Sequence, residues 1–191
     1  SGLYVLTDVS GREMELVVEC DMVTAGGGWT KVGQQSFPAL FSNASLQFAN
    51  VENPGSAAYG ILDRLPQLRG SEGWEFRMVW PRLASESAWL LHMGGGRNEI
   101  WWAQDWWADD DAHSCFTAID VPYGSRAGFW GLTAGISNAS VVGSMSEAPF
   151  FSFGYVEGDF PNGFPGPRLH TADLSQDSYV SEVALYVRPY D

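Results

Sequence analysis

Hydrophobic and polar positions alternate in several short runs of this chain, and alternation with period two is typical of strands with one buried face. The clearest run covers residues 74–80, where apolar side chains alternate with Glu75 and Arg77. A second run, at residues 180–187, closes the chain and is strongly apolar. The two runs predict strands, and with them a protein built mainly of sheet.

Less regular runs complete the predicted elements. Apolar residues recur at helical spacing over residues 57–65, between an N-cap at Ser56 and a stop at Pro66, and predict one short helix. Residues 98–122 have no period, and residues 157–170 are rich in glycine and proline. The expected fold class is α+β, with a mostly antiparallel, twisted sheet, few short helices and a loop-rich C-terminal half. Further strands are predicted at residues 3–6, 14–20, 29–32, 88–93, 128–130 and 150–153.

The length of the chain, 191 residues, fits a single domain. Within it we distinguish an N-terminal strand subdomain at residues 1–34. A central sheet is expected from residues 35–95 together with residues 126–191. Two segments, at residues 96–125 and 155–175, are predicted to be long loops that carry the function.

The chain is strongly acidic, with a net charge of −13, and Lys31 is its only lysine. This charge opposes binding to nucleic acid and to anionic membrane surfaces. No apolar run approaches the roughly 20 residues that span a bilayer, so we expect no membrane insertion. The sequence opens inside a strand pattern at Ser1 without a signal peptide, which leads us to expect one domain of a larger protein.

Three consecutive glycines interrupt the strand pattern at residues 26–28, directly before Trp29. Glycine permits positive φ and close backbone approach. Because a large aromatic residue follows at once, we predict a tight turn between two strands, with the indole of Trp29 buried in a core.

The two cysteines, Cys20 and Cys115, are too few for a tetrahedral Cys₄ zinc site. From the residues alone, either they pair with each other or each has a partner outside this chain.

Distinctive motifs stand at both ends of the chain: Ser1-Gly2-Leu3-Tyr4, Cys20-Asp21-Met22, Gly26-Gly27-Gly28-Trp29-Thr30 and the closing run at residues 182–189. In this order and spacing they resemble fibrinogen-related domains, a family that includes ficolins, tachylectins and intelectins. The resemblance covers the first thirty-odd residues and the last ten, and the middle only in general layout. It implies an extracellular recognition domain, commonly a lectin, with a calcium ion in its loop-rich C-terminal half.

The cysteines depart from the pattern of that family. There, the cysteine that matches Cys20 pairs with one just before the Ser-Gly-x-Tyr motif, and a second pair lies in the C-terminal half. This chain has only Cys115 in that region. A bond between Cys20 and Cys115 would therefore rewire the family's pattern, and two unpaired thiols are the alternative.

The chemically richest segment is residues 105–115, which holds Asp105 and the run Asp109, Asp110, Asp111 before Cys115. Calcium takes six to eight oxygen ligands, and adjacent aspartates on a loop concentrate them. In an extended segment Asp109 and Asp111 point the same way. We predict these two as metal ligands, with Asp105 and Asp110 as lesser candidates. A solvated acidic loop is the alternative.

The resemblance bears on the same segment, because the calcium loop of the family has an Asp-x-Asp pattern a few residues before a cysteine. In this chain the aspartates lie two residues closer to the cysteine than in the family.

Tryptophans beside carboxylates suit a glycan site, because indoles stack on the apolar faces of sugars while hydroxyls bind carboxylates, amides or calcium. The alternatives are core packing for each indole and surface or capping roles for each histidine. The candidate ligand-binding residues are Trp106, Trp107, His113, Tyr155, Asn162 and His170.

The sequence therefore predicts an extracellular, calcium-dependent glycan-binding module without catalytic activity. The second hypothesis is a structural or adhesive module that binds a protein partner. A glycosidase, which needs two carboxylates about 5–10 Å apart, ranks third. The chain contains no Gly-x-Ser-x-Gly elbow, no His-Glu-x-x-His motif and no phosphate-binding glycine loop that ends in lysine.

Overall fold

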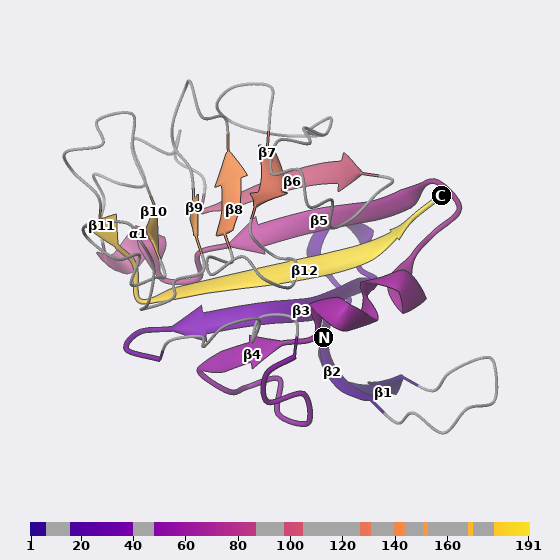
Figure 1. The fold of residues 1–191 in the computed structure, drawn as a ribbon, viewed down its shortest axis with the longest axis horizontal. Coiled ribbons are helices and arrows are strands. Elements are labelled where there is room, and N and C mark those ends of the chain that lie inside the picture. The colour runs from indigo at the N-terminus through magenta and orange to yellow at the C-terminus, as the bar shows by residue number, and fades with distance from the viewer. Residues whose placement is uncertain are drawn as a thin grey trace.

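The computed structural model describes residues 1–6, 16–39, 48–86, 98–104, 127–130, 140–143, 151–152, 168–169 and 178–191. Two antiparallel sheets contain the strands of this part of the chain (Figure 1). The first has the order β1-β2-β3-β12-β5-β6, and β4 pairs with residues 33–35 of β3 outside this path. Its strands are β1 (Gly2–Leu6), β2 (Leu16–Asp21), β3 (Trp29–Ser36), β4 (Ala58–Gly60), β5 (Gly73–Val79), β6 (Glu99–Gln104) and β12 (Glu182–Tyr190).

The second sheet has the order β11-β10-β9-β8-β7 and consists of short strands. They are β7 (Ala127–Trp130), β8 (Ser140–Gly143), β9 (Phe151–Ser152), β10 (Arg168–Leu169) and β11 (Ser178–Tyr179). The described helical elements are also short: η1 (Thr24–Gly26), η2 (Leu62–Leu68) and α1 (Leu83–Glu86). No helix among the described residues is long and apolar enough to cross a membrane.

The last strand, β12, lies between β3 and β5 in the middle of the first sheet (Figure 1). It pairs with β3 over residues 182–187 and with β5 over residues 184–190. Because β12 also carries an apolar face of Val183, Leu185 and Val187, all buried, it joins the two ends of the sequence in one core.

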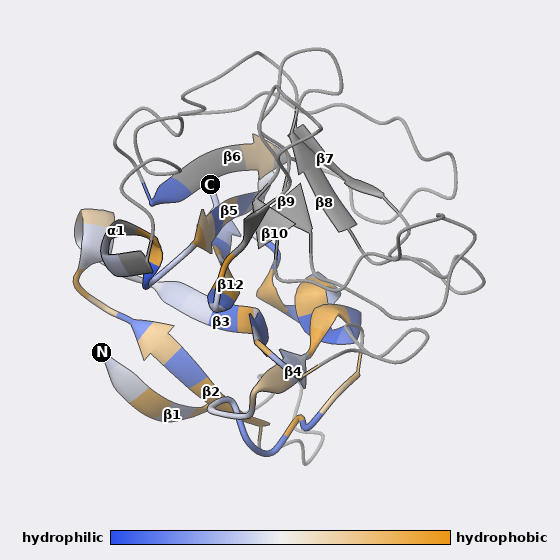
Figure 2. Cartoon of the chain, turned by 90° about the vertical axis from the view of Figure 1, so that its left-hand side faces the viewer, coloured by the Kyte–Doolittle hydropathy of each residue, from blue (hydrophilic) through white to orange (hydrophobic). Residues whose placement is uncertain are grey.

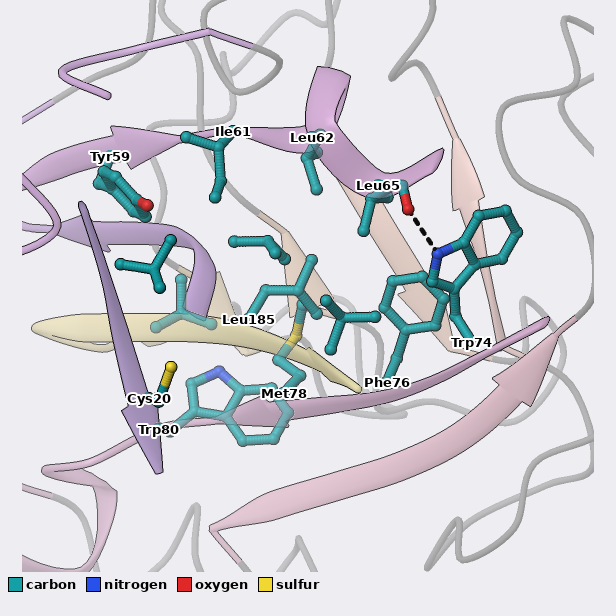
Figure 3. Close-up of a cluster of buried hydrophobic side chains, with 14 of the residues drawn as sticks. Cys20, Tyr59, Ile61, Leu62, Leu65, Trp74, Phe76, Met78, Trp80 and Leu185 are labelled. Atoms are coloured by element: carbon teal, nitrogen blue, oxygen red, sulfur yellow. Dashed lines mark hydrogen bonds between the residues drawn. The ribbon is translucent and has the colours of Figure 1, made fainter. Parts of the chain in front are cut away.

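One face of the first sheet forms the hydrophobic core (Figure 3). Phe76 and Met78 of β5 and Leu185 of β12 are fully buried there. The helix η2 contributes Leu62 and Leu65 to the same core. The indole of Trp74 donates a hydrogen bond to the carbonyl oxygen of Leu65 at 2.8 Å, which ties η2 to β5.

The prediction of a sheet-rich, mostly antiparallel protein is confirmed for the described residues. Seven predicted strands correspond to observed ones, although bounds differ by a few residues. The matched strands are β1, β2, β3, β5, β7, β9 and β12, of which β12 was the closing run. The strand predicted at residues 88–93 lies outside the described residues.

The helix predicted over residues 57–65 is wrong in its bounds, since only residues 62–65 of it are helical, in η2. Residues 58–60 form the strand β4 instead, and Pro66 lies inside the 3-10 helix η2 and does not end it. The apolar spacing, made by Ala57, Ala58, Ile61, Leu62 and Leu65, was misleading because it runs across two elements: Ala58 lies in β4, and Leu62 and Leu65 lie in η2.

Two further features differ from the sequence interpretation. Residues 99–104, predicted to belong to a loop, form β6 and pair with β5. The central sheet expected from residues 35–95 and 126–191 is divided, since β7 to β11 form a sheet of their own. The N-terminal strands are part of the first sheet, where β3 pairs with β12.

Candidate functional site

The residues predicted to bind calcium and glycan lie outside the described part of the chain. They are Asp105, Trp106, Trp107, Asp109, Asp110, Asp111, His113, Tyr155, Asn162 and His170. The structure does place the ends of the segment that holds most of them. β6 ends at Gln104, which pairs with Trp74 of β5, and β7 begins at Ala127. The segment 105–126 therefore connects the first sheet to the second.

The glycine turn before Trp29 is described in full, and it confirms the predicted tight turn. Ala25, Gly26, Gly27 and Gly28 all have positive φ, from 48° to 88°. Gly27, with φ 80° and ψ −160°, occupies a region of backbone conformation that is essentially restricted to glycine. A Cβ atom at this residue would lie 2.5 Å from the carbonyl oxygen of Met22. This turn therefore requires glycine at residue 27.

Trp29, the residue that follows the turn, is completely buried. Its indole N–H donates to the carbonyl oxygen of Thr24 at 3.0 Å. The Arg188 guanidinium lies 4.3 Å from the centre of the indole ring and donates to the carbonyl oxygens of Ala25 (2.8 Å) and Gly27 (3.1 Å). The turn thus holds a cation against the aromatic ring, an attraction of about 1–2 kcal/mol when partly desolvated.

The face of the first sheet opposite the hydrophobic core carries a network of charges that we call the ionic cluster. Lys31 donates to Glu19 at 2.6 Å, and Arg188 pairs with Glu75. Arg77 bridges two carboxylates, at 2.8 Å from Asp21 and 2.7 Å from Glu99. The members of the ionic cluster are Glu19, Asp21, Lys31, Glu75, Arg77, Glu99 and Arg188, with the rings of Trp29 and Tyr186 among them.

The ionic cluster follows from strand alternation. In β5, Phe76 and Met78 point to the core, so Glu75 and Arg77 point to the other face. The same alternation in β12 sends Leu185 to the core and Tyr186 to the charged face. The cluster draws on five strands: β2, β3, β5, β6 and β12.

Burial makes this pairing energetically important. The side chains of Lys31 and Arg77 are only 6% and 10% exposed. Removing one partner from such a pair leaves an uncompensated charge and is strongly destabilising. The ammonium group of Lys31 is further satisfied by Gln34 at 2.6 Å. The ionic cluster therefore holds the strands in place relative to one another, and its charged side chains form ion pairs among themselves.

Asp21 is the most perturbed carboxylate of the ionic cluster. Burial would raise its pKa, but it accepts hydrogen bonds from the side chain of Thr24, from the backbone N–H groups of Val23 and Thr24 and from Arg77. The hydroxyl of Ser1 also donates to it at 3.0 Å. These donors favour the charged form and hold the pKa of Asp21 well below its usual range.

The lowered pKa of Asp21 makes stability depend on acid. In the unfolded chain an aspartate titrates near pH 4, so its stabilising contribution is complete above that pH. The contribution is lost as the pH falls below about 4 towards the lower folded pKa. We expect Asp21→Asn to lower the urea midpoint at pH 7 and to make the decrease between pH 5 and pH 3 shallower. Asp63, whose pKa is raised by burial, acts in the opposite direction, so Asp63→Asn is the control.

A steeper acid dependence in Asp21→Asn than in the parent chain would contradict this account.

Tyr186, Tyr59 and Cys20 are titratable side chains whose pKa values are raised by burial. Burial, with Glu19 nearby, raises the pKa of Tyr186, so its phenol stays protonated and donates to Glu19 at 3.4 Å. Burial also raises the pKa of Tyr59, which lies in the core. Cys20 is buried, and burial raises the pKa of its thiol, which makes an unpaired Cys20 a poor nucleophile. Cys115 lies outside the described residues, so a Cys20–Cys115 bond stays a prediction.

Within the described residues, no group of three or more histidine, cysteine, aspartate or glutamate side chains is arranged to hold a metal ion. The carboxylates of the ionic cluster face cations of the protein.

The sequence interpretation did not identify the ionic cluster. The alternation of residues 74–80 correctly placed Glu75 and Arg77 on one face, but such a face is usually solvated. In the structure both faces of β5 are buried. The missing signal was the matching charge in distant strands, namely Glu19 in β2, Lys31 in β3 and Arg188 in β12, which only the strand order brings together.

No protein-family model matches the chain. A search of curated proteins also finds no match.

Proposed function

We propose that this chain is a calcium-dependent, non-catalytic glycan-binding module of the fibrinogen-related type, with the α+β fold of fibrinogen C-terminal-like domains. It would act outside the cell as part of a larger multidomain or oligomeric protein. The observation that carries the proposal is the acidic, tryptophan-rich segment at residues 105–115, in a chain whose two ends resemble that family.

The donors in this segment suit calcium. Carboxylate oxygens are the ligands that calcium prefers, and three adjacent aspartates repel one another unless a cation neutralises them. Asp109 and Asp111 would hold the ion, with Asp105 and Asp110 as further donors. Bound calcium would supply a positive centre for sugar hydroxyls.

The aromatic residues suit glycan binding, the second part of the proposal. Trp106 and Trp107 would stack on the apolar faces of a sugar ring. His113, Tyr155, Asn162 and His170 are polar candidates for contacts to its hydroxyls.

The scaffold at the start of the segment supports the proposal. Residues 105–126 leave the first sheet at Gln104, whose strand β6 pairs with β5 over six residue pairs. β5 in turn pairs with β12 over seven residue pairs. Binding residues are commonly found on loops that a rigid scaffold positions, and β6 gives the segment such an origin.

The metal half of the proposal is tested by removing charge from the segment. We expect the double variant Asp109→Asn, Asp111→Asn to bind calcium at least tenfold more weakly, because neutral amides replace charged ligands. Titration calorimetry with Ca²⁺, before and after EDTA treatment, measures this. The matched control is Glu52→Gln, Glu72→Gln, which removes two exposed charges elsewhere in the sequence.

Failure of the parent chain to bind Ca²⁺ at millimolar concentration would overturn the metal half. A glycan array without hits in calcium would overturn the lectin half.

The alternative function, an adhesive module that binds a protein partner, is favoured by one observation. β1 exposes Leu3, Tyr4 and Val5, an unusual concentration of apolar side chains on one strand. Protein binding with no response to calcium or to glycans would favour this alternative.

A further inference from the structure

The strand β1 forms one edge of the first sheet. Among the described strands it pairs only with β2, in a register of five residue pairs from Gly2↔Cys20 to Leu6↔Leu16. Figures 1 and 2 both place β1 at the outer margin of the sheet, beside β2. Its other side presents backbone N–H and C=O groups in the geometry that a further strand would require.

The side chains of β1 are exposed although they are apolar. Leu3 is 67%, Tyr4 43% and Val5 55% exposed. Natural edge strands are usually protected from pairing by lysine, by proline, by a bulge or by a charged residue that points inward. Gly2–Leu6 contains no charge and no proline, and its register with β2 is uninterrupted. This edge therefore lacks the usual protection against another strand.

The sequence of β1 is complementary to itself. Directly opposed residues share a face, so Leu3 and Val5 lie on the face of Glu19 and Val17, while Tyr4 lies on the face of Val18. An antiparallel pairing of two β1 strands about Tyr4 would put Leu3 of each copy opposite Val5 of the other. The two Tyr4 rings would meet on the opposite face, as an aromatic cross-strand pair.

Local charges also permit a second copy to approach. The two acidic residues of β2, Glu19 and Asp21, are neutralised by Lys31 and Arg77 in the ionic cluster. The edge is therefore locally compensated, although the chain as a whole carries a net charge of −13. That net charge produces a long-range repulsion between copies, which salt screens.

We propose that β1 is a docking edge for a second copy of this chain, and that two copies join their first sheets by antiparallel β1–β1 pairing about a two-fold axis. Such an isologous contact closes after two copies. Pairing of two five-residue strands lies in the size range of weak interfaces, below about 1,200 Å². The dimer is therefore a micromolar to millimolar one, and it needs neither calcium nor glycan.

Sedimentation equilibrium, from low micromolar to millimolar protein, tests the proposal. A monomer–dimer equilibrium is expected, with tighter association in about 0.5 M than in about 0.05 M NaCl because of screening. EDTA is expected to leave it unchanged, which separates this test from the proposed calcium function. A chain that stays monomeric at every concentration and salt level overturns the proposal.

The variant Tyr4→Lys locates the contact. It places two ammonium groups opposite each other at the two-fold axis, where like charges are destabilising, so association is expected to weaken by at least about tenfold. The matched control is Tyr190→Lys, which makes the same change at a tyrosine of similar exposure, 40% against 43%, on β12. The control is expected to retain the association of the parent chain.

A second variant, Leu3→Lys, separates loss of the contact from misfolding, because Leu3 is the most exposed side chain of β1 and its replacement should leave the fold intact. It is expected to weaken association while its thermal unfolding stays close to that of the parent chain. Loss of association in Tyr190→Lys but not in Tyr4→Lys or Leu3→Lys assigns the contact to another surface and overturns the proposal. So does a chain that stays monomeric but binds a peptide strand of another sequence.

Discussion

Replacing Gly27 with alanine is expected to lower the free energy of unfolding by about 4 kcal/mol, from backbone strain of about 1–3 kcal/mol and a steric clash of similar size. The strain arises because φ 80° with ψ −160° is accessible almost only to glycine. The clash arises because the new Cβ atom would lie 2.5 Å from the oxygen and 2.7 Å from the carbon of the Met22 carbonyl. Both atoms are backbone, so neither can move aside by a rotamer change.

Two other glycines separate these contributions. Gly28 also has φ 80°, but a Cβ atom there would meet nothing within 4 Å, so Gly28→Ala is expected to cost only about 1–2 kcal/mol. Gly55 has neither positive φ nor a close contact, with its nearest atom 3.5 Å away. Gly55→Ala should change stability by no more than about 0.5 kcal/mol.

Urea denaturation of the three alanine variants measures the series. The expected order of destabilisation is Gly27, then Gly28, then Gly55. Equal losses for Gly27→Ala and Gly28→Ala would show that the backbone at Met22 yields to the new methyl group, and would contradict the close approach as the cause.

The glycine turn was the part of the fold that the sequence defined best. Three glycines before a tryptophan have few other physical uses, and Trp29 is fully buried as predicted. Strands at residues 74–80 and 180–187 were also evident, because their apolar positions alternate over a whole strand length. The local pattern of apolar residues was sufficient to predict an element wherever that pattern came from one element alone.

Local pattern failed where burial came from several elements. Ala58 lies in β4, whereas Leu62 and Leu65 lie in η2, and the spacing of these apolar residues along the chain imitated one helix. The strand β6 has no alternation in its sequence, Glu-Ile-Trp-Trp-Ala-Gln, and depends on its pairing with β5. Such pairing is tertiary information, which a single sequence does not carry in readable form.

The candidate calcium-binding and glycan-binding residues were predicted from side-chain chemistry and not from a hydrophobic pattern. They were chosen for the chemistry of carboxylates and indoles in residues 105–115. The sequence names the donors there without fixing a distance between any two of them. The ionic cluster shows why this matters, because its carboxylates are equally acidic in sequence yet are held by Arg77, Lys31 and Arg188.

The ionic cluster itself leads to the second large effect. Replacing Arg77 with methionine is expected to lower the free energy of unfolding by about 3–5 kcal/mol, the loss seen when a buried ion pair is broken from one side. The side chain is 10% exposed and pairs with Asp21 and Glu99, whose side chains are 20% and 29% exposed. Methionine preserves most of the volume beside Trp29 and Tyr186, so the loss reports charge more than packing.

The matched control is Arg82→Met. Arg82 also faces a carboxylate, Glu182, but at 3.6 Å and with 66% of its side chain exposed. An exposed pair of this kind contributes about 0–1 kcal/mol. The same substitution should therefore have an effect several times smaller at Arg82 than at Arg77.

A double-mutant cycle identifies the partner. Asp21→Asn in the Arg77→Met background is expected to cost less than in the parent chain, with a coupling of about 1–3 kcal/mol for charges in direct contact. Without Arg77 the folded pKa of Asp21 rises towards its ordinary value, so the acid-dependent loss of stability below pH 4 should also become shallower. Additive effects together with an unchanged pH profile would mean that Asp21 is stabilised by Ser1, by the side chain of Thr24 and by the backbone of residues 23–24, without a contribution from Arg77.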